Sequence, residues 1–165
     1  MEEIVAEILL DLKAVHVDLD YPFLLTSGRI SPVYVDCRKI ISFPNERREI
    51  IEFAETVVKK IGEIDVIAGG ETAGIPFAAW LSEKMDLPMI YVRKKPKGHG
   101  KFAQVEGEVR EGDRVLLFED LIFDGGSKIN FSDGIRKTGA KMEHCLVIFE
   151  YGSDETRKNL MDHGI

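Results

Sequence analysis

Residues 114–127 read RVLLFEDLIFDGGS, a sequence that joins an apolar run, two adjacent acids and a glycine turn. The run RVLLFE at residues 114–119 is nearly continuous in hydrophobicity and too short for a helix, which is typical of a strand buried on both faces of a sheet. The residues after the turn, from about 127 to 138, have a helical pattern. A buried strand that turns directly into a helix is a building unit of parallel α/β sheets.

The rest of the chain repeats this alternation of strand and helix. Short apolar runs predict three further strands, IDVIA at 64–68, PMIYV at 88–92 and CLVIFE at 145–150. Helical patterns cover about residues 4–15, 50–61, 75–85 and 155–162. We therefore predict an α/β fold with a central, mostly parallel sheet flanked by helices, and we expect functional loops at the carboxyl ends of the strands.

The composition narrows the class of protein. The 165 residues include 29 Asp and Glu against 22 Lys and Arg, a formal charge of −7, which argues against nucleic acid or an anionic membrane as a partner. No apolar run approaches the ~20 residues of a membrane span. The acidic N-terminus and the two distant cysteines, Cys37 and Cys145, favour a cytoplasmic protein. The length predicts a single domain over residues 1–165.

One segment departs from this acidic average. Residues 93–101, which we call the basic segment, read RKKPKGHGK and contain no carboxylate. Its cations, such as Arg93 and Lys97, can neutralise a diphosphate, and its glycines favour a segment that closes over a bound substrate. A run of like charges is also common on a solvated surface, so the segment alone leaves both interpretations open.

The loop that follows residues 114–119 suits a phosphoribosyl group. The backbone N–H groups of GGS at 125–127, aimed by the positive end of the following helix, form a site for a phosphate. Glu119 and Asp120 offer acceptors for ribose hydroxyls. The alternative is an ordinary turn into a helix, capped by Asp124 or Ser127.

A second glycine turn, GGETAGIP at 69–76, also suits a close backbone approach by an anion, although glycine and proline are common at any helix start. Neither turn has the spacing of a Walker A motif or of G-x-G-x-x-G, so nucleotide hydrolysis and dinucleotide chemistry lose their main support. The four histidines show no spacing typical of metal ligands.

These motifs together resemble a known family. EDLIFDGGS at 119–127 resembles the phosphoribosyl diphosphate (PRPP) signature of the type I phosphoribosyltransferases. FLLTSGRISPVYVDCRK at 23–39, GGETAGIPFA at 69–78 and RKKPKGHGKFAQVEG at 93–107 are similar to segments of the orotate phosphoribosyltransferases within that family. The resemblance implies the type I phosphoribosyltransferase fold, with a small N-terminal hood region and a flexible catalytic loop. It also implies transfer of ribose 5-phosphate from PRPP to orotate in pyrimidine biosynthesis, with orotidine 5′-monophosphate and diphosphate as products.

The resemblance assigns roles to individual residues. It implies catalytic roles for Lys97, His99, Glu119 and Asp120. The PRPP site that it implies comprises Glu71, Thr72, Ala73, Arg93, Lys94, Lys97, His99, Glu119, Asp120, Leu121, Ile122, Phe123, Asp124, Gly125, Gly126 and Ser127. For orotate it implies Thr26, Ser27 and Phe123. Mg²⁺ would be held mainly by PRPP oxygens and water, with no metal ligand from the protein.

The resemblance also implies an organisation for the single domain. Residues 1–45 would form a helix and the hood on the orotate side, residues 46–150 the PRPP-binding core, and residues 151–165 a short C-terminal helix. The substrates would be PRPP and orotate. The enzyme would be a cytoplasmic homodimer in which the catalytic loop reaches into the partner's active site.

Two alternative functions stay open at this point. Many relatives have Thr or Ser where this chain has Phe123, Lys where it has Thr26, and Arg near Glu150 and Tyr151. These differences favour, as an alternative, a phosphoribosyltransferase for another base. A non-catalytic regulator that senses PRPP or a nucleotide is the other alternative, although such a sensor has no evident need for the basic segment.

Overall fold

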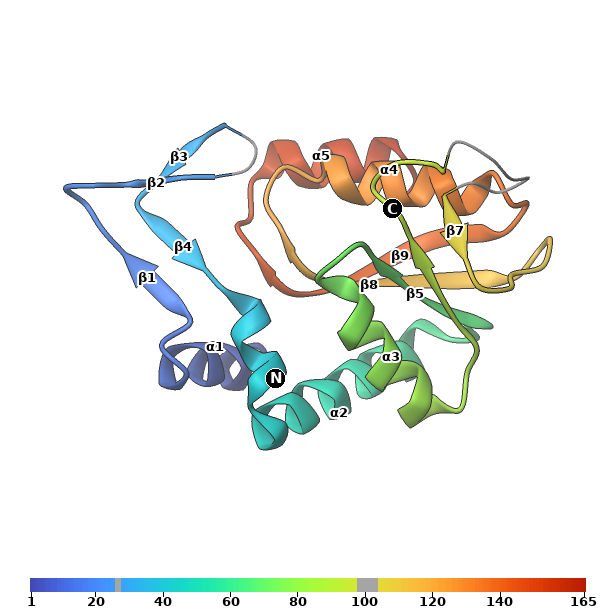
Figure 1. The fold of residues 1–165 in the computed structure, drawn as a ribbon, viewed down its shortest axis with the longest axis horizontal. Helices are drawn as coiled ribbons and strands as arrows, with labels where there is room; N and C mark the ends of the chain where they lie inside the picture. Colours follow the sequence, from blue (N-terminus) through green and yellow to red (C-terminus); the bar gives the residue numbers. More distant parts are fainter. Residues whose placement is uncertain (26–27, 98–103) are drawn as a thin grey trace. The chain divides into compact units, whose positions relative to one another are not determined.

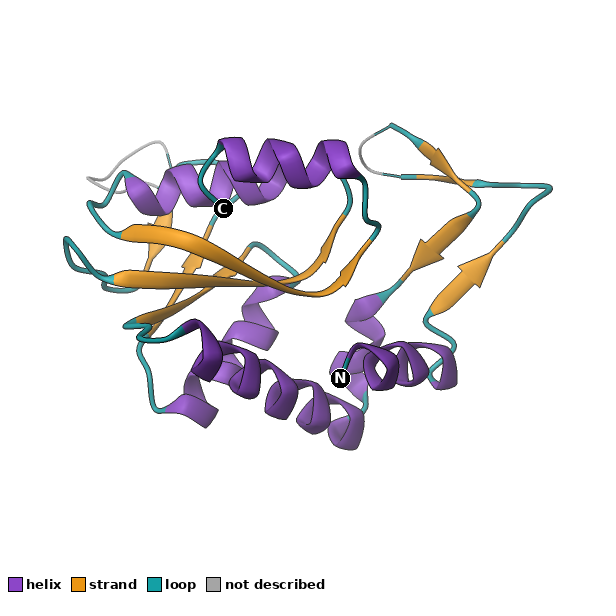
Figure 2. Ribbon diagram, turned by 180° about the vertical axis from the view of Figure 1, so that it is seen from behind, coloured by secondary structure: helices purple, strands orange, loops and turns teal. Residues whose placement is uncertain are grey.

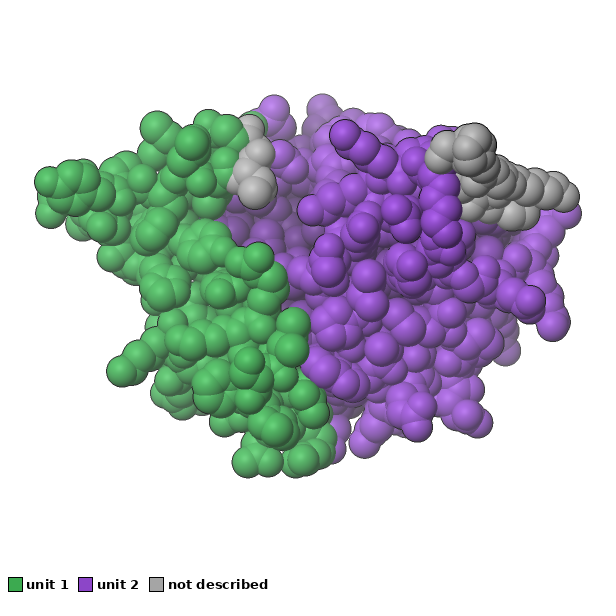
Figure 3. Space-filling model, in the orientation of Figure 1, with its two compact units in different colours: residues 1–50 green, residues 51–165 purple. Residues whose placement is uncertain are grey.

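In the computed structural model, residues 1–25, 28–97 and 104–165 are described. The chain divides into two compact units, residues 1–50 and residues 51–165 (Figure 3). Within the described residues, no helix is long and apolar enough to cross a membrane.

The first unit contains a helix and two small antiparallel sheets (Figure 1). Its elements are α1 (Glu2–Asp11), β1 (Val15–Val17) paired with β4 (Val33–Val35), β2 (Phe23–Leu24) paired with β3 (Ile30–Ser31), and the 3₁₀ helix η1 (Cys37–Ser42). Helix α2 (Pro44–Ile61) begins in this unit and continues into the second. The predicted helix over residues 4–15 is wrong at its end, because Lys13 adopts a φ of 51° that stops the helix and Val15 begins β1.

The second unit is built on a five-stranded sheet with the order β7-β6-β5-β8-β9. The strands are β5 (Val66–Gly70), β6 (Met89–Val92), β7 (Val105–Glu106), β8 (Arg114–Ile122) and β9 (Lys141–Glu150). All neighbours are parallel except β7, which pairs antiparallel with β6 at the edge. The predicted α/β fold with a mostly parallel central sheet is confirmed.

Helices cover both faces of this sheet (Figure 2). Helices α4 (Gly126–Arg136) and α5 (Asp154–Asp162) lie on one face, and α3 (Gly74–Met85) lies on the other with the later part of α2. The side chains of successive β8 residues point to opposite faces of the sheet, as in any strand. Leu117 packs with Phe131 of α4, whereas the rings of Phe118 and Phe77 of α3 lie 6.0 Å apart.

The main differences from the predicted boundaries lie in α2, which begins at Pro44 and not at residue 50, and in β8 and β9. Strand β8 does not end at residue 119 but continues to Ile122, because Leu121 and Ile122 pair with Phe149 and Glu150 of β9. Strand β9 begins at Lys141, before the predicted start at residue 145. Glu119, predicted as the last residue of the strand, and Asp120, predicted just after it, therefore both lie inside the strand.

The last residues of the chain are held against α4 by one side chain. The Arg136 guanidinium donates hydrogen bonds to the carbonyl oxygens of His163 (2.6 Å) and Gly164 (2.7 Å), and its Nε donates to Met142 O (3.1 Å). The residues after α5 are thereby joined to α4 and to β9.

Candidate functional site

Three of the predicted loops meet at one edge of the sheet in the second unit. Because β5 is parallel to both β6 and β8, the carboxyl ends of these strands lie together, with Gly70 beside Val92 and Gly69 beside Phe118. The GGETAGIP turn, the described part of the basic segment and the β8–α4 loop all follow these ends. This is the edge where parallel α/β sheets bind ligands.

Glu119 is the most enclosed charge at this edge. It is 4% exposed, its Oε1 accepts a hydrogen bond from the Gly70 N–H (2.8 Å), and its Oε2 accepts one from Lys128 Nζ (2.9 Å). Lys128, in the first turn of α4, is 5% exposed. Burial raises the pKa of the Glu119 carboxyl, and the positive charge of Lys128 opposes that rise. The pair is therefore a desolvated ion pair.

The glycines of the GGETAGIP turn make room for this carboxylate. A Cβ at Gly74 would lie 1.9 Å from Glu119 Oε1, and a Cβ at Gly70 would lie 2.2 Å from Phe131 Cε2. The sequence suggests that these glycines allow an anion to approach, and in the structure the anion beside Gly70 and Gly74 is Glu119 itself. Between them, Glu71 accepts a hydrogen bond from the Lys94 N–H (2.9 Å), and the Glu71–Thr72 peptide bond is cis.

Asp120 has a different environment from its neighbour. Consecutive residues of a strand point to opposite faces, so the two acids predicted as a pair are separated by β8. Asp120 is partly exposed, and its Oδ1 accepts a hydrogen bond from the Leu121 N–H (2.9 Å). Asp120 thus offers an accessible carboxylate, whereas that of Glu119 is enclosed.

The β8–α4 loop has the backbone expected of an anion-binding turn. Gly125 occupies the N-cap position of α4 with a φ of 79°, which favours glycine. Neither Asp124 nor Ser127, the caps predicted by the alternative interpretation, holds that position, although Asp124 Oδ1 accepts a hydrogen bond from the Gly126 N–H (3.0 Å). Helix α5 supports the loop through Thr156, whose hydroxyl donates to Phe123 O (3.1 Å).

The basic segment is described as far as Lys97, and His99 lies outside the described residues. Arg93 Nη1 lies 3.5 Å from Glu106 Oε1, and Lys97 Nζ contacts the same oxygen. The hydrogen bond from Lys97 lowers the pKa of Glu106. At the base of the segment, the Arg93 N–H donates to Gln104 O (2.8 Å), and Gln104 Nε2 donates to Arg93 O (3.1 Å).

The predicted orotate residues are only partly described. Thr26 and Ser27 lie outside the described residues. Phe123 lies edge-on to Tyr151 at 5.1 Å between ring centroids, and Tyr151 meets Phe149 in the same way at 5.1 Å. Phe123 and Tyr151 are thus in contact with each other.

Comparison with known proteins gives the family. The family model of the phosphoribosyl transferase domain matches residues 39–162. An orotate phosphoribosyltransferase from Roseobacter denitrificans is 54% identical over 169 aligned residues, which cover 100% of this chain and 75% of that protein. The chain belongs to the orotate phosphoribosyltransferase family. The family predicted from the sequence motifs is therefore confirmed.

Solved structures agree with this family and with its fold. The orotate phosphoribosyltransferase from Aeropyrum pernix is 26% identical, with a TM-score of 0.83 over 98% of this chain and 89% of that one. The UMP synthase of Leishmania donovani is 30% identical, with a TM-score of 0.78 over 96% of this chain and 33% of that longer one. The type I phosphoribosyltransferase fold is thus also confirmed for this orotate phosphoribosyltransferase family member.

The structure adds residues that the sequence analysis missed. Lys128 is the partner of Glu119, and a lysine in the first turn of a helix is a usable signal, because the helix dipole disfavours a cation there. Gln104 and Asn130 also connect the site, since Asn130 Nδ2 donates to Lys94 O (3.1 Å) and Gln104 Nε2 approaches Asn130 O (3.3 Å). No local pattern in the sequence singles out these two amides.

Proposed function

We propose that this chain transfers the 5-phosphoribosyl group of PRPP to orotate, giving orotidine 5′-monophosphate and diphosphate in pyrimidine biosynthesis. The observation that carries the proposal is the 54% identity to an orotate phosphoribosyltransferase over the whole of this chain. The meeting of three loops suited to anions at one sheet edge supports it independently. We also propose that the protein works in the cytoplasm.

The roles that we propose follow the charge of each part of the substrate. The Ser127 N–H at the start of α4 would hold the 5′-phosphate, because the Gly126 N–H already donates to Asp124 Oδ1. Asp120, whose carboxylate is accessible, would face the ribose, and the enclosed Glu119 would add negative charge near it, so that both stabilise positive charge that develops there. Arg93, Lys94 and Lys97, with His99, would neutralise the diphosphate that leaves. Positioning and electrostatic stabilisation supply most of the catalysis in such a transfer.

We propose that the magnesium ion of the reaction arrives with PRPP. Within the described part of the chain, no cluster of three or more His, Cys, Asp or Glu residues could form a protein cage for a metal. Mg²⁺ commonly keeps several waters and binds through substrate phosphates. The ion, when bound, would neutralise charge on the diphosphate, and we assign it to PRPP oxygens and water and not to a residue of the chain.

The direct test follows the consumption of orotate with PRPP and Mg²⁺. We expect turnover by the unmodified protein. For Lys97→Ala we expect a loss on the order of 10²-fold in kcat, because this change removes a positive charge beside the leaving diphosphate. Lys60→Ala, an exposed lysine on α2, is the matched control and should leave kcat unchanged. Turnover of adenine or uracil in place of orotate would favour another base. Tight PRPP binding without turnover of any base would contradict the proposal and favour a sensor.

We also propose that the protein is a homodimer in which Lys97 acts in the partner's active site. If so, mixing Lys97→Ala with Asp120→Asn chains should restore about a quarter of the unmodified activity, because half of the dimers are then mixed and each has one intact site. Each variant alone gives the background. Mixed dimers that form, as judged by native mass spectrometry, and yet have only background activity would contradict this arrangement.

A further inference from the structure

The ion pair between Lys128 and Glu119 occupies an unusual place. Lys128 lies in the first turn of α4, where the positive end of the helix dipole disfavours a cation. Its ammonium group nevertheless points to Glu119 Oε2 at 2.9 Å and also lies 3.3 Å from Ser127 Oγ. Lys128 therefore contacts both the carboxylate of Glu119 and the hydroxyl of Ser127 in the β8–α4 loop.

Stability alone does not account for such a pair. The desolvation of two buried charges offsets most of their attraction, and an apolar pair of similar volume is often as stable. The two residues are 5% and 4% exposed, so their desolvation is nearly complete. The presence of both charges at the edge of the site therefore points to a role in the reaction.

The surroundings of Glu119 show that Lys128 supplies the positive charge beside its carboxylate. From β5 the Gly70 N–H donates to the carboxylate, while the neighbouring Asp120 repels its negative charge. Cys145 of β9 adds no charge, because burial raises the pKa of its thiol to about 12. Burial itself favours the protonated form of Glu119. Of the charged groups that face this carboxylate within the described residues, Lys128 is the one that favours its ionised form.

We propose that Lys128 is a positioning residue of the phosphoribosyl site, which holds the enclosed Glu119 carboxylate in place as an ion pair and engages Ser127 Oγ so that the Ser127 hydroxyl proton is directed to the phosphate. A serine oxygen that accepts from Lys128 keeps its own proton to donate. An ionised Glu119 stabilises a cationic ribosyl centre, whereas a protonated one does not. The inference rests on the proposed function, because it takes PRPP as the ligand of this edge.

The test compares Lys128→Met with the unmodified protein over pH. We expect kcat to fall on the order of tenfold or more, since hydrogen bonds between charged groups contribute a factor of that size. We expect KM for PRPP to rise and KM for orotate to stay unchanged. The acidic limb of kcat/KM should move to higher pH by about one unit or more, because the pKa of Glu119 rises when the cation is lost. Lys128→Arg should restore part of both effects.

Two further variants separate positioning from mere support of the fold. Lys137→Met removes an exposed lysine from the other end of the same helix and should change none of these quantities. In a Glu119→Gln background, Lys128→Met should cause a smaller further loss of kcat, because no carboxylate charge is left to control and only the contact with Ser127 Oγ is lost. If Lys128→Met does not fold, the pH measurement is made on Lys128→Gln, because glutamine still donates a hydrogen bond but has no charge.

These measurements test the role of Lys128 separately from the proposed function. A fall in kcat with an unmoved acidic limb, repeated in full in the Glu119→Gln background, would overturn the positioning role while orotate turnover stands. If the unmodified protein turns over no orotate, the proposed function fails, and calorimetry of PRPP binding then tests Lys128 alone. In that case we expect Lys128→Met to weaken PRPP binding most at low pH, and equal binding by both proteins would overturn the inference.

Discussion

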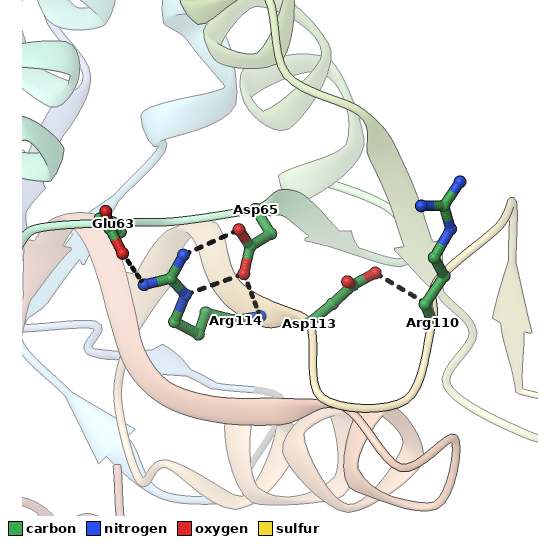
Figure 4. A network of polar contacts seen from close by, with 5 residues as sticks. All are labelled: Glu63, Asp65, Arg110, Asp113 and Arg114. Atoms are coloured by element: carbon green, nitrogen blue, oxygen red, sulfur yellow. Dashed lines mark hydrogen bonds and ion pairs between the residues drawn. The ribbon is translucent and has the colours of Figure 1, made fainter.

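Strand β8 carries an ion pair near each end, and the two differ in their access to water. At its start, the Arg114 guanidinium donates two hydrogen bonds to Asp65 (2.8 and 2.9 Å) and contacts Glu63, and the Arg114 backbone N–H donates a third to Asp65 (2.8 Å), in the network drawn in Figure 4. The Arg114 side chain is 42% exposed and that of Asp65 is 38% exposed, against 6% for Lys128 and 5% for Glu119. The exposed pair is screened by solvent and holds two strands together, whereas the buried pair determines the charge of a site residue.

The largest effect should come from breaking the buried pair. Glu119→Ala leaves the Lys128 ammonium buried without its partner, and we expect the free energy of unfolding to fall by about 3–5 kcal/mol. Urea denaturation at neutral pH measures this. Glu63→Ala, which removes an exposed partner of Arg114, is the matched control and should leave the urea midpoint almost unchanged. Equal losses in the two variants would remove the contrast between the two ends of β8.

A smaller effect should come from crowding the buried pair without removing a charge. A Cβ at Gly74 would meet Glu119 Oε1 and lie 2.7 Å from Phe118 O, so Gly74→Ala must displace the carboxylate and the adjoining backbone of β8, and we expect a loss of about 1–3 kcal/mol in unfolding free energy. Gly126→Ala is the control, because its Cβ would meet only Asp124 Oδ1 at an ordinary 3.5 Å. Thermal denaturation compares the two variants. A Gly74→Ala protein as stable as the unmodified one would mean that Glu119 is not tightly packed.

The smallest effect concerns the exposed pair and appears as a dependence on pH. The hydrogen bonds from Arg114 lower the pKa of Asp65 from 3.8 to about 2. Because the pKa in the folded state is the lower one, the pair stabilises the fold above about pH 4 and this contribution is lost as the pH falls toward 2. Arg114→Met should therefore lower the unfolding temperature slightly at pH 7, and the difference should shrink between pH 4 and 2.

Arg110→Met is the control for this measurement. In the same network it is the Arg110 backbone N–H that donates to Asp113 (2.7 Å), so loss of the side chain leaves this bond in place. The unfolding temperature of this variant should follow that of the unmodified protein at every pH. A difference for Arg114→Met that persists unchanged at pH 2 would contradict the assignment to Asp65.

The sequence predicted the strands at the centre of the fold because these strands are buried on both faces and read as continuous apolar runs. It did not predict that β8 continues past Glu119, since the pairing of Leu121 with Phe149 is a tertiary contact. Nor did it predict β7, whose two residues carry no strand pattern of their own. The helix predicted over residues 4–15 ends early through the conformation of one residue, Lys13.

The site was predictable in its loops but not in its internal contacts. Glycine turns after strands identify the edge where GGETAGIP and EDLIFDGGS meet. The sequence treats Glu119 and Asp120 as equivalent, and only the direction of each side chain from β8 separates the enclosed acid from the accessible one. Lys128 was missed because a helical lysine is ordinarily a surface residue, and its partner is recognisable only once the helix lies on the sheet.

The double link between Arg93 and Gln104 fixes the base of the segment between them. These two residues hold both ends of the intervening segment beside each other and next to the pairing of β6 with β7. Residues inserted between them lengthen a loop whose base is already fixed, and each doubling of such a loop costs only about 0.6 kcal/mol. A longer segment between Arg93 and Gln104 should therefore cost little stability while the register of the sheet edge stays the same.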